Sequence, residues 1–120
     1  MKKGLLITLP RHDLVTEYLS YYSKEIIEEA EKMGLPSKQL KDKDANKSNF
    51  EKFSESDGYK LIVFNGHGTA KSIQGYKNEP LVEEGVNEEI LKDKISYARA
   101  CDAASSLGIK AAANSKRVVL

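Results

Sequence analysis

The sequence predicts an α/β fold: a Rossmann-like, three-layer sandwich in which helices cover both faces of a mainly parallel sheet. Short, nearly continuous apolar runs at 5–9 and 61–64 are typical of strands that are buried on both faces. Helical patterns separate these runs along the chain. Strands that alternate with helices are typical of parallel sheets joined by right-handed crossovers.

The first strand is predicted at residues 5–9, and Pro10 ends it because proline has no N–H to donate. Asp13 then offers a carboxylate that can cap a helix. One amphipathic helix is therefore expected over 14–33. Apolar side chains recur along it at steps of three or four, namely Val15, Tyr18, Tyr22, Ile26, Ala30 and Met33.

Gly34 and Pro36 are expected to end this helix. Glycine readily takes the left-handed conformation that follows many helices, and proline cannot continue a helix. Three tyrosines, Tyr18, Tyr21 and Tyr22, are expected to form a helix face that packs on the sheet.

The next segment is polar and rich in lysine, and a short edge strand is predicted there at 38–41. Phe50 and Phe53 lie three residues apart within 45–54, which predicts a short helix that packs an aromatic face. The strand at 60–64 carries four consecutive apolar residues, which predicts a central position with helices on both faces.

Residues 69–85 contain glycine and proline with scattered apolar side chains, and they are expected to form a long irregular loop beside a functional site. Asn87 is expected to cap a short helix that includes Ile90 and Leu91. The remaining predicted elements are a strand at 94–100, a helix at 102–107 and the beginning of a strand at 118–120.

Composition limits the possible partners. The 120 residues are expected to form one domain, 1–120. The 19 Lys and Arg are interleaved with 18 Asp and Glu, which gives no reason to expect a nucleic-acid or membrane surface.

The apolar run at 5–9 is too short for a signal peptide. A single cysteine fits a reducing compartment, so the expected location is the cytoplasm.

His67 and Cys101 each follow a predicted strand. The carboxyl ends of parallel strands meet at one edge of the sheet, so the two side chains are expected to be neighbours. A thiol attacks as its thiolate, and at neutral pH a free thiol is ionised to a few per cent. His67 is the candidate base that takes the thiol proton and later returns it to the leaving group.

The glycines on either side of His67 are the second part of this candidate site. Gly66 and Gly68 allow the backbone to approach a substrate closely. The amide of Gly68 is a candidate donor to an oxyanion.

An apolar strand ending in Gly66-His67-Gly68, followed by a strand ending in Ala100-Cys101, resembles the caspase-like cysteine peptidases, and the bacterial and archaeal CHAT-like members most closely. The resemblance implies a caspase-like topology, a Cys101–His67 dyad, and an oxyanion hole formed by Gly68 and the Cys101 amide. It also implies a peptide or protein substrate and no cofactor. Members of this group usually have further C-terminal strands.

Two arginines are candidates for substrate recognition. Arg99 lies two residues before Cys101 on the same strand face, where relatives line the pocket for the residue that precedes the cleaved bond. Arg11 follows the first strand and resembles a pocket arginine of caspases. Arginine binds carboxylates through two parallel hydrogen bonds, so a preference for an acidic residue is expected.

Alternatives remain beside this hypothesis. A lone cysteine after a strand is often a small core residue, and the chain is alternatively a non-catalytic module that binds a protein or small ligand at the same edge. His12-Asp13 either orients substrate or His67, or is an N-cap beside an exposed histidine. One cysteine and two histidines without paired spacing predict no metal site. The oligomeric state is left open.

Overall fold

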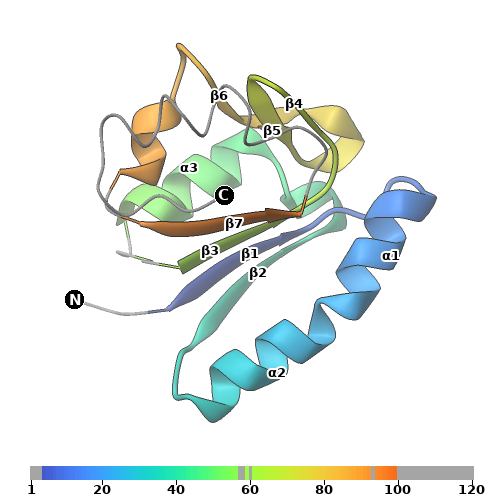
Figure 1. The fold of residues 1–120 in the computed structure, drawn as a ribbon, viewed down its shortest axis with the longest axis vertical. Coiled ribbons are helices and arrows are strands. Elements are labelled where there is room, and N and C mark those ends of the chain that lie inside the picture. The colour runs from blue at the N-terminus through green and yellow to red at the C-terminus, as the bar shows by residue number, and fades with distance from the viewer. Residues whose placement is uncertain (1–3, 57–58, 60, 93, 100–120) are drawn as a thin grey trace.

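The computed structural model describes residues 4–56, 59, 61–92 and 94–99. Its main sheet has four parallel strands in the order β2-β1-β3-β7 (Figure 1). These strands are β1 (Leu5–Leu9), β2 (Ser37–Lys41), β3 (Leu61–Asn65) and β7 (Ile95–Arg99). The predicted α/β fold with a parallel sheet is confirmed, and the strands predicted at 5–9, 38–41, 60–64 and 94–100 each start and end within one residue of the observed bounds.

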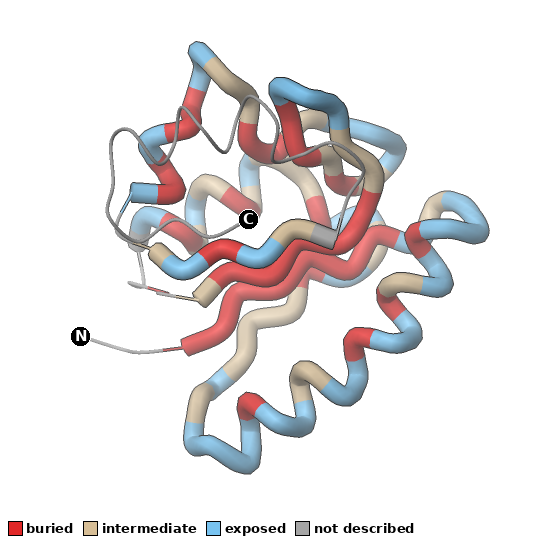
Figure 2. The backbone as a smooth tube through the Cα atoms, in the orientation of Figure 1, coloured by how far each residue is buried: buried red, intermediate tan, exposed pale blue. Residues whose placement is uncertain are grey.

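The central strands β1 and β3 are the most deeply buried part of the sheet (Figure 2). Every side chain of β1 is buried, and Leu5 pairs with Leu61 in parallel register. Successive side chains of a strand point to opposite faces. The two faces of these strands therefore contribute to two separate cores, one above and one below the sheet.

Helices α1 (Leu14–Tyr22) and α2 (Lys24–Lys32) cover one face (Figure 1). Ala30 on α2 packs there against Leu5, Ile7 and Val63. The single helix predicted over 14–33 is divided at Ser23, whose hydroxyl donates to the Leu19 carbonyl oxygen at 2.8 Å. Such a bond competes with the helix ladder and often bends a helix. The predicted left-handed glycine after the helix is confirmed at Gly34, whose φ is 78°.

The prediction that the tyrosines of α1 pack on the sheet was wrong. Tyr18, Tyr21 and Tyr22 are each more than half exposed. The Tyr22 ring contacts the other two, with its centroid 4.7 Å from that of Tyr18 and 5.1 Å from that of Tyr21. Thr16 and Ser20 are the buried residues of α1, and the Ser20 hydroxyl donates to the Pro10 carbonyl oxygen at 2.8 Å. The buried stripe of α1 is therefore polar and hydrogen-bonded, which an apolar periodicity does not reveal.

The opposite face is covered by α3 (Lys47–Ser56), the 3₁₀ helix η3 (Glu88–Leu91) and a second, smaller sheet (Figure 1). Phe50 of α3 is fully buried, with its ring centroid 5.2 Å from that of Phe64 on β3. The predicted aromatic face of this helix is confirmed for Phe50, whereas Phe53 is only partly buried.

The prediction of a long irregular loop at 69–85 was wrong. The structure has three antiparallel strands there, β4 (Gly68–Thr69), β5 (Ser72–Gln74) and β6 (Pro80–Glu83), joined in part by the 3₁₀ helix η2 (Tyr76–Asn78). Strands of two to four residues are too short to show an alternating pattern. They are held by the burial of Ile73, Leu81 and Val82 against the sheet, which is a tertiary effect.

Asn87 precedes η3 as predicted, but its side chain does not cap that helix. It accepts a hydrogen bond from the Glu83 amide at 2.8 Å and donates to the Leu81 carbonyl oxygen at 2.8 Å. These two hydrogen bonds therefore hold the residue before η3 against β6. A further 3₁₀ helix, η1 (Asp42–Asp44), follows β2. The elements predicted at 102–107 and 118–120 lie outside the described residues, and no described helix is long and apolar enough to cross a membrane.

The strand order creates a switch point between β1 and β3. From β1 the chain passes through α1 and α2 to β2 on one side, and then returns through α3 to β3 on the other side. The connection that leaves β1, made of α1 and α2, covers one face of the sheet. The connection that leaves β3, made of the small sheet and η3, covers the opposite face. In open α/β sheets this divergence opens a crevice at the carboxyl ends, where ligands bind.

Candidate functional site

His67 lies at this switch point, two residues after the end of β3. Gly66 precedes it with a φ of 147°, a conformation that side chains rarely adopt. A Cβ at Gly66 would lie 2.7 Å from the Gln74 carbonyl oxygen, so only glycine fits there. The Gln74 amide donates to the His67 carbonyl oxygen at 2.9 Å, which holds the His67 backbone against β5. The sequence around His67 therefore fixes the backbone that carries the imidazole.

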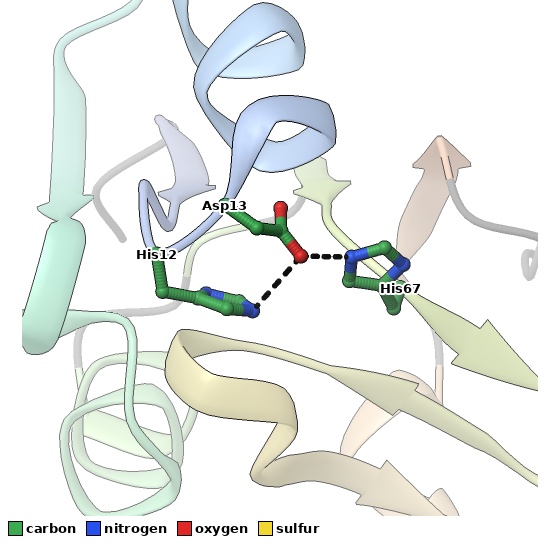
Figure 3. A group of neighbouring side chains, drawn as sticks. All are labelled: His12, Asp13 and His67. Carbon is green, nitrogen blue, oxygen red and sulfur yellow. Dashed lines mark hydrogen bonds and ion pairs between the residues drawn. The ribbon is translucent and has the colours of Figure 1, made fainter.

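Asp13 lies on the other side of the switch point, between β1 and α1 (Figure 3). Its Oδ2 is 2.6 Å from Nε2 of His67. An ionised carboxylate can only accept hydrogen bonds, so Nε2 of His67 is the donor. In the neutral ring the second nitrogen, Nδ1, then has the free lone pair.

The two oxygens of the Asp13 carboxylate have separate partners. Oδ1 accepts from the Thr16 amide at 2.9 Å and from the Thr16 hydroxyl at 2.8 Å, while that hydroxyl accepts from the Asp13 amide. This capping box begins α1. Oδ2 is left for the histidine side chains. The bond from the Thr16 amide, and secondly the bond from His67, hold the pKa of the Asp13 carboxyl well below its usual range, although desolvation opposes them.

The prediction of an N-cap at Asp13 is confirmed, but the accompanying expectation of an exposed His12 was wrong. The His12 side chain is 9% exposed and lies edge-on to the Tyr76 ring, with centroids 5.7 Å apart. Its Nε2 is 3.3 Å from Oδ1 of Asn78 and 3.7 Å from Oδ2 of Asp13. Its Nδ1 is buried without a hydrogen-bond partner among the described residues. Tyr76 and Asn78 belong to η2, so the segment predicted as a loop forms one wall of the site.

The predicted neighbour of His67, Cys101, lies outside the described residues. The strands that lead to the two residues are adjacent and parallel, and Asn65 at the end of β3 pairs with Arg99 at the end of β7. His67 and Cys101 are each two positions beyond this pair in the sequence. The backbone of Arg99 is part of β7, and its side chain lies outside the described part of the chain.

Gly68, the candidate oxyanion donor, begins β4 and faces Ile73 of β5. Hydrogen-bonded and non-hydrogen-bonded pairs alternate along an antiparallel ladder. The Gln74 amide bonds to His67, so the next pair, Gly68 with Ile73, is the non-hydrogen-bonded kind. The Gly68 amide is therefore directed away from β5.

Arg11 follows β1, as predicted, and is exposed. Its guanidinium is 3.9 Å from the Glu17 carboxylate, and both side chains are more than half exposed, so this pair contributes little stability. Arg11 lines a cavity of about 220 Å³ beside α2 and β2 and a second one of about 440 Å³ beside the tyrosines of α1. His67 lines neither of these cavities. The role of Arg11 in substrate recognition stays a prediction.

Comparison of the chain with protein families, with curated proteins and with solved structures finds no match.

The two functions of Asp13 can be separated by mutation. Asp13→Ala is expected to lower the free energy of unfolding by about 1 kcal/mol because α1 loses its N-cap. Asp13→Ser is expected to recover most of this loss, since serine also caps helices but is too short to reach His67. Urea unfolding of both variants measures the difference. An equal loss in both would mean that the contact with His67, and not the cap, stabilises the fold.

Proposed function

We propose that the chain is a cysteine peptidase in which His67 activates Cys101 and Asp13 orients His67. The observation that supports this most is the 2.6 Å hydrogen bond between Asp13 and His67 at the switch point of the sheet. A nucleophile, its base and a third group that orients the base are the recurring components of covalent hydrolysis. The strand order and the small sheet beyond His67 fit a caspase-like topology, which is part of the same proposal.

In the proposed reaction, Nδ1 of His67 takes the thiol proton as the sulfur attacks the carbonyl carbon of the substrate. The carbonyl oxygen becomes an oxyanion, to which the Gly68 amide and the Cys101 amide donate. When the C–N bond breaks, Nδ1 gives its proton to the leaving amine and a thioester remains. Water then attacks the carbonyl carbon of the thioester and gives a proton to Nδ1. The C–S bond breaks, the Cys101 sulfur takes the proton back from Nδ1, and the carboxylic acid departs.

Asp13 supports the action of His67 as a base because it determines which ring nitrogen of His67 carries the proton. Because its carboxylate accepts from Nε2, the lone pair of the neutral ring is on Nδ1, the nitrogen that points away from Asp13 (Figure 3). Throughout the reaction the carboxylate also stabilises the imidazolium that forms on His67. The Thr16 hydrogen bonds keep that carboxylate ionised and fixed at the start of α1.

The proposed substrate is a peptide or protein with an acidic residue before the cleaved bond, bound by Arg99 and Arg11, and the proposed location is the cytoplasm. Reporter peptides with Asp, Glu, Lys or Arg at that position test the activity and the preference together. Wild-type protein is expected to hydrolyse the acidic peptides, Cys101→Ser none, and Arg99→Ala is expected to lose the preference. No hydrolysis by the wild type would favour the non-catalytic binding module, and an unchanged ranking in Arg99→Ala would contradict the role of that arginine.

A further inference from the structure

We infer that His12, Asp13 and His67 form a binding site for a divalent transition-metal ion of the Zn²⁺ class. One donor atom from each residue lies within 4.8 Å of both others. The three come from opposite sides of the switch point: His12 and Asp13 follow β1, and His67 follows β3. Sequence spacing gave no sign of such a site because the donors are paired by the topology of the sheet.

The chemistry of the three donors fits this class of ion. Imidazole nitrogen and carboxylate oxygen are both ordinary zinc ligands, at about 2.0–2.2 Å from the metal. Zinc bound by three protein side chains keeps a position for water or substrate. Softer ions that prefer sulfur and harder ions that prefer an all-oxygen shell are both disfavoured by two imidazoles and one carboxylate.

The geometry requires all three distances between donor atoms to change. Ligand atoms around a tetrahedral zinc ion lie about 3.3–3.4 Å apart, as the bond lengths imply. Oδ2 of Asp13 is 3.7 Å from Nε2 of His12 and 2.6 Å from Nε2 of His67. The first distance must therefore shorten and the second must lengthen, each by less than about 1 Å. The donor atoms of the two histidines lie within 4.8 Å of each other and must approach by up to about 1.5 Å. Both nitrogens already face the same carboxylate oxygen, so no side chain has to turn around (Figure 3).

Burial provides a second observation. The His12 side chain is only 9% exposed, and its Nε2, the proposed ligand atom, has only long contacts with the described residues, to Oδ1 of Asn78 at 3.3 Å and to Oδ2 of Asp13 at 3.7 Å. Contacts with these residues therefore hold this nitrogen only weakly. His67 and Asp13 are 32% and 40% exposed, so an ion can enter from solvent past them and reach His12 below. Asn78 Oδ1, 3.3 Å from Nε2 of His12, is at the inner edge of the site.

The site itself does not depend on the proposed peptidase activity, but one consequence of it does. A metal ion on Nε2 of His67 takes the place of the proton there, so the neutral ring carries its proton on Nδ1. Nδ1 can then no longer accept the thiol proton. Metal binding and the action of His67 as a base are therefore mutually exclusive, and the ion is expected to inhibit hydrolysis.

The test uses the whole chain with Zn²⁺ added alone, read by calorimetry and by ¹⁵N NMR of the imidazoles. The chain has only two histidines, so just two ring systems appear in the spectrum. One equivalent of Zn²⁺ is expected to shift Nε2 of both rings and to leave both in the Nδ1–H form. The same result is expected in Cys101→Ser, in which the thiol cannot be a ligand.

Variants give the second measurement. His67→Gln and His12→Gln are each expected to weaken zinc binding by at least about 10- to 100-fold, whereas Glu29→Gln, which removes an exposed carboxylate on α2, is expected to leave it unchanged. Shifts in one ring or in neither, or binding that disappears in Cys101→Ser, would overturn the inference. The spectrum of the wild type decides this even where a His12 variant fails to fold. Neither measurement uses hydrolysis. A protein that binds zinc as expected but hydrolyses no peptide would therefore contradict the proposed peptidase activity and still support the metal site.

Discussion

His67→Gln is expected to lower the rate of peptide hydrolysis by about 10²- to 10⁴-fold, the usual contribution of a positioned acid–base group. Glutamine retains a polar amide of similar reach but cannot take up a proton. The rate is measured as kcat/KM on an acidic reporter peptide, with a chelator present so that bound metal does not mask the effect.

Two variants control this measurement. Glu29→Gln changes an exposed carboxylate on α2 and is expected to retain full activity. Asp13→Ser retains the helix cap but not the hydrogen bond to His67, so its rate is expected to lie between those of the wild type and His67→Gln. A misplaced catalytic group can cost about 10²-fold. A His67→Gln rate within a factor of two of the wild type would remove His67 from the mechanism.

Phe50→Ala is expected to lower the free energy of unfolding by about 3–5 kcal/mol, the usual cost of truncating a fully buried phenylalanine. Phe50 is fully buried and joins α3 to the sheet through its contact with Phe64. Because α3 and the small sheet share this core, the loss also loosens the support beneath the site. Natural domains are stable by about 5–15 kcal/mol, so the variant is expected to be close to unfolding.

Phe53→Ala is the matched control, because it removes the same side chain from the same helix one turn later. Phe53 is only partly buried, and Lys38 and Lys52 place their ammonium groups 4.5 and 5.4 Å from its ring centroid. The loss is expected to be smaller because less apolar surface is removed from the core. Equal losses in urea unfolding would contradict the assignment of Phe50 as the anchor of α3.

The parallel sheet was predictable because its two central strands carry strong local signals. β1 and β3 are buried on both faces, and burial on both faces selects continuous apolar runs. The start of α1 was predictable for a similar reason, since Asp13 is a capping residue directly before a helical pattern.

The small sheet and the inner face of α1 were not predictable by these rules. β4, β5 and β6 have two to four residues each, and packing on the large sheet rather than local propensity determines them. α1 buries Thr16 and Ser20 and exposes three tyrosines, the reverse of what hydrophobicity suggests. In both places a few hydrogen bonds and buried contacts outweigh the sequence pattern.

The candidate site was predicted in part. His67 was selected because it follows a strand and lies between glycines, and its position at the switch point agrees with that argument. The convergence of His12 and Asp13 on His67 depends on the order of strands in the sheet, which one sequence does not specify. Asp13 was interpreted mainly as a cap, and the structure shows that one carboxylate oxygen caps α1 while the other meets His67.

The most direct test of the proposed function is the rate at which iodoacetamide alkylates Cys101 at neutral pH, in the wild type and in His67→Gln, with a chelator present. Cys101 is the one cysteine in the chain, so the mass of the intact protein reports its modification without ambiguity. If His67 takes the thiol proton, the wild type is expected to react about 10-fold faster than His67→Gln or more, because an unassisted thiol is only a few per cent ionised. Equal, slow alkylation of both proteins would contradict the activation of Cys101 by His67.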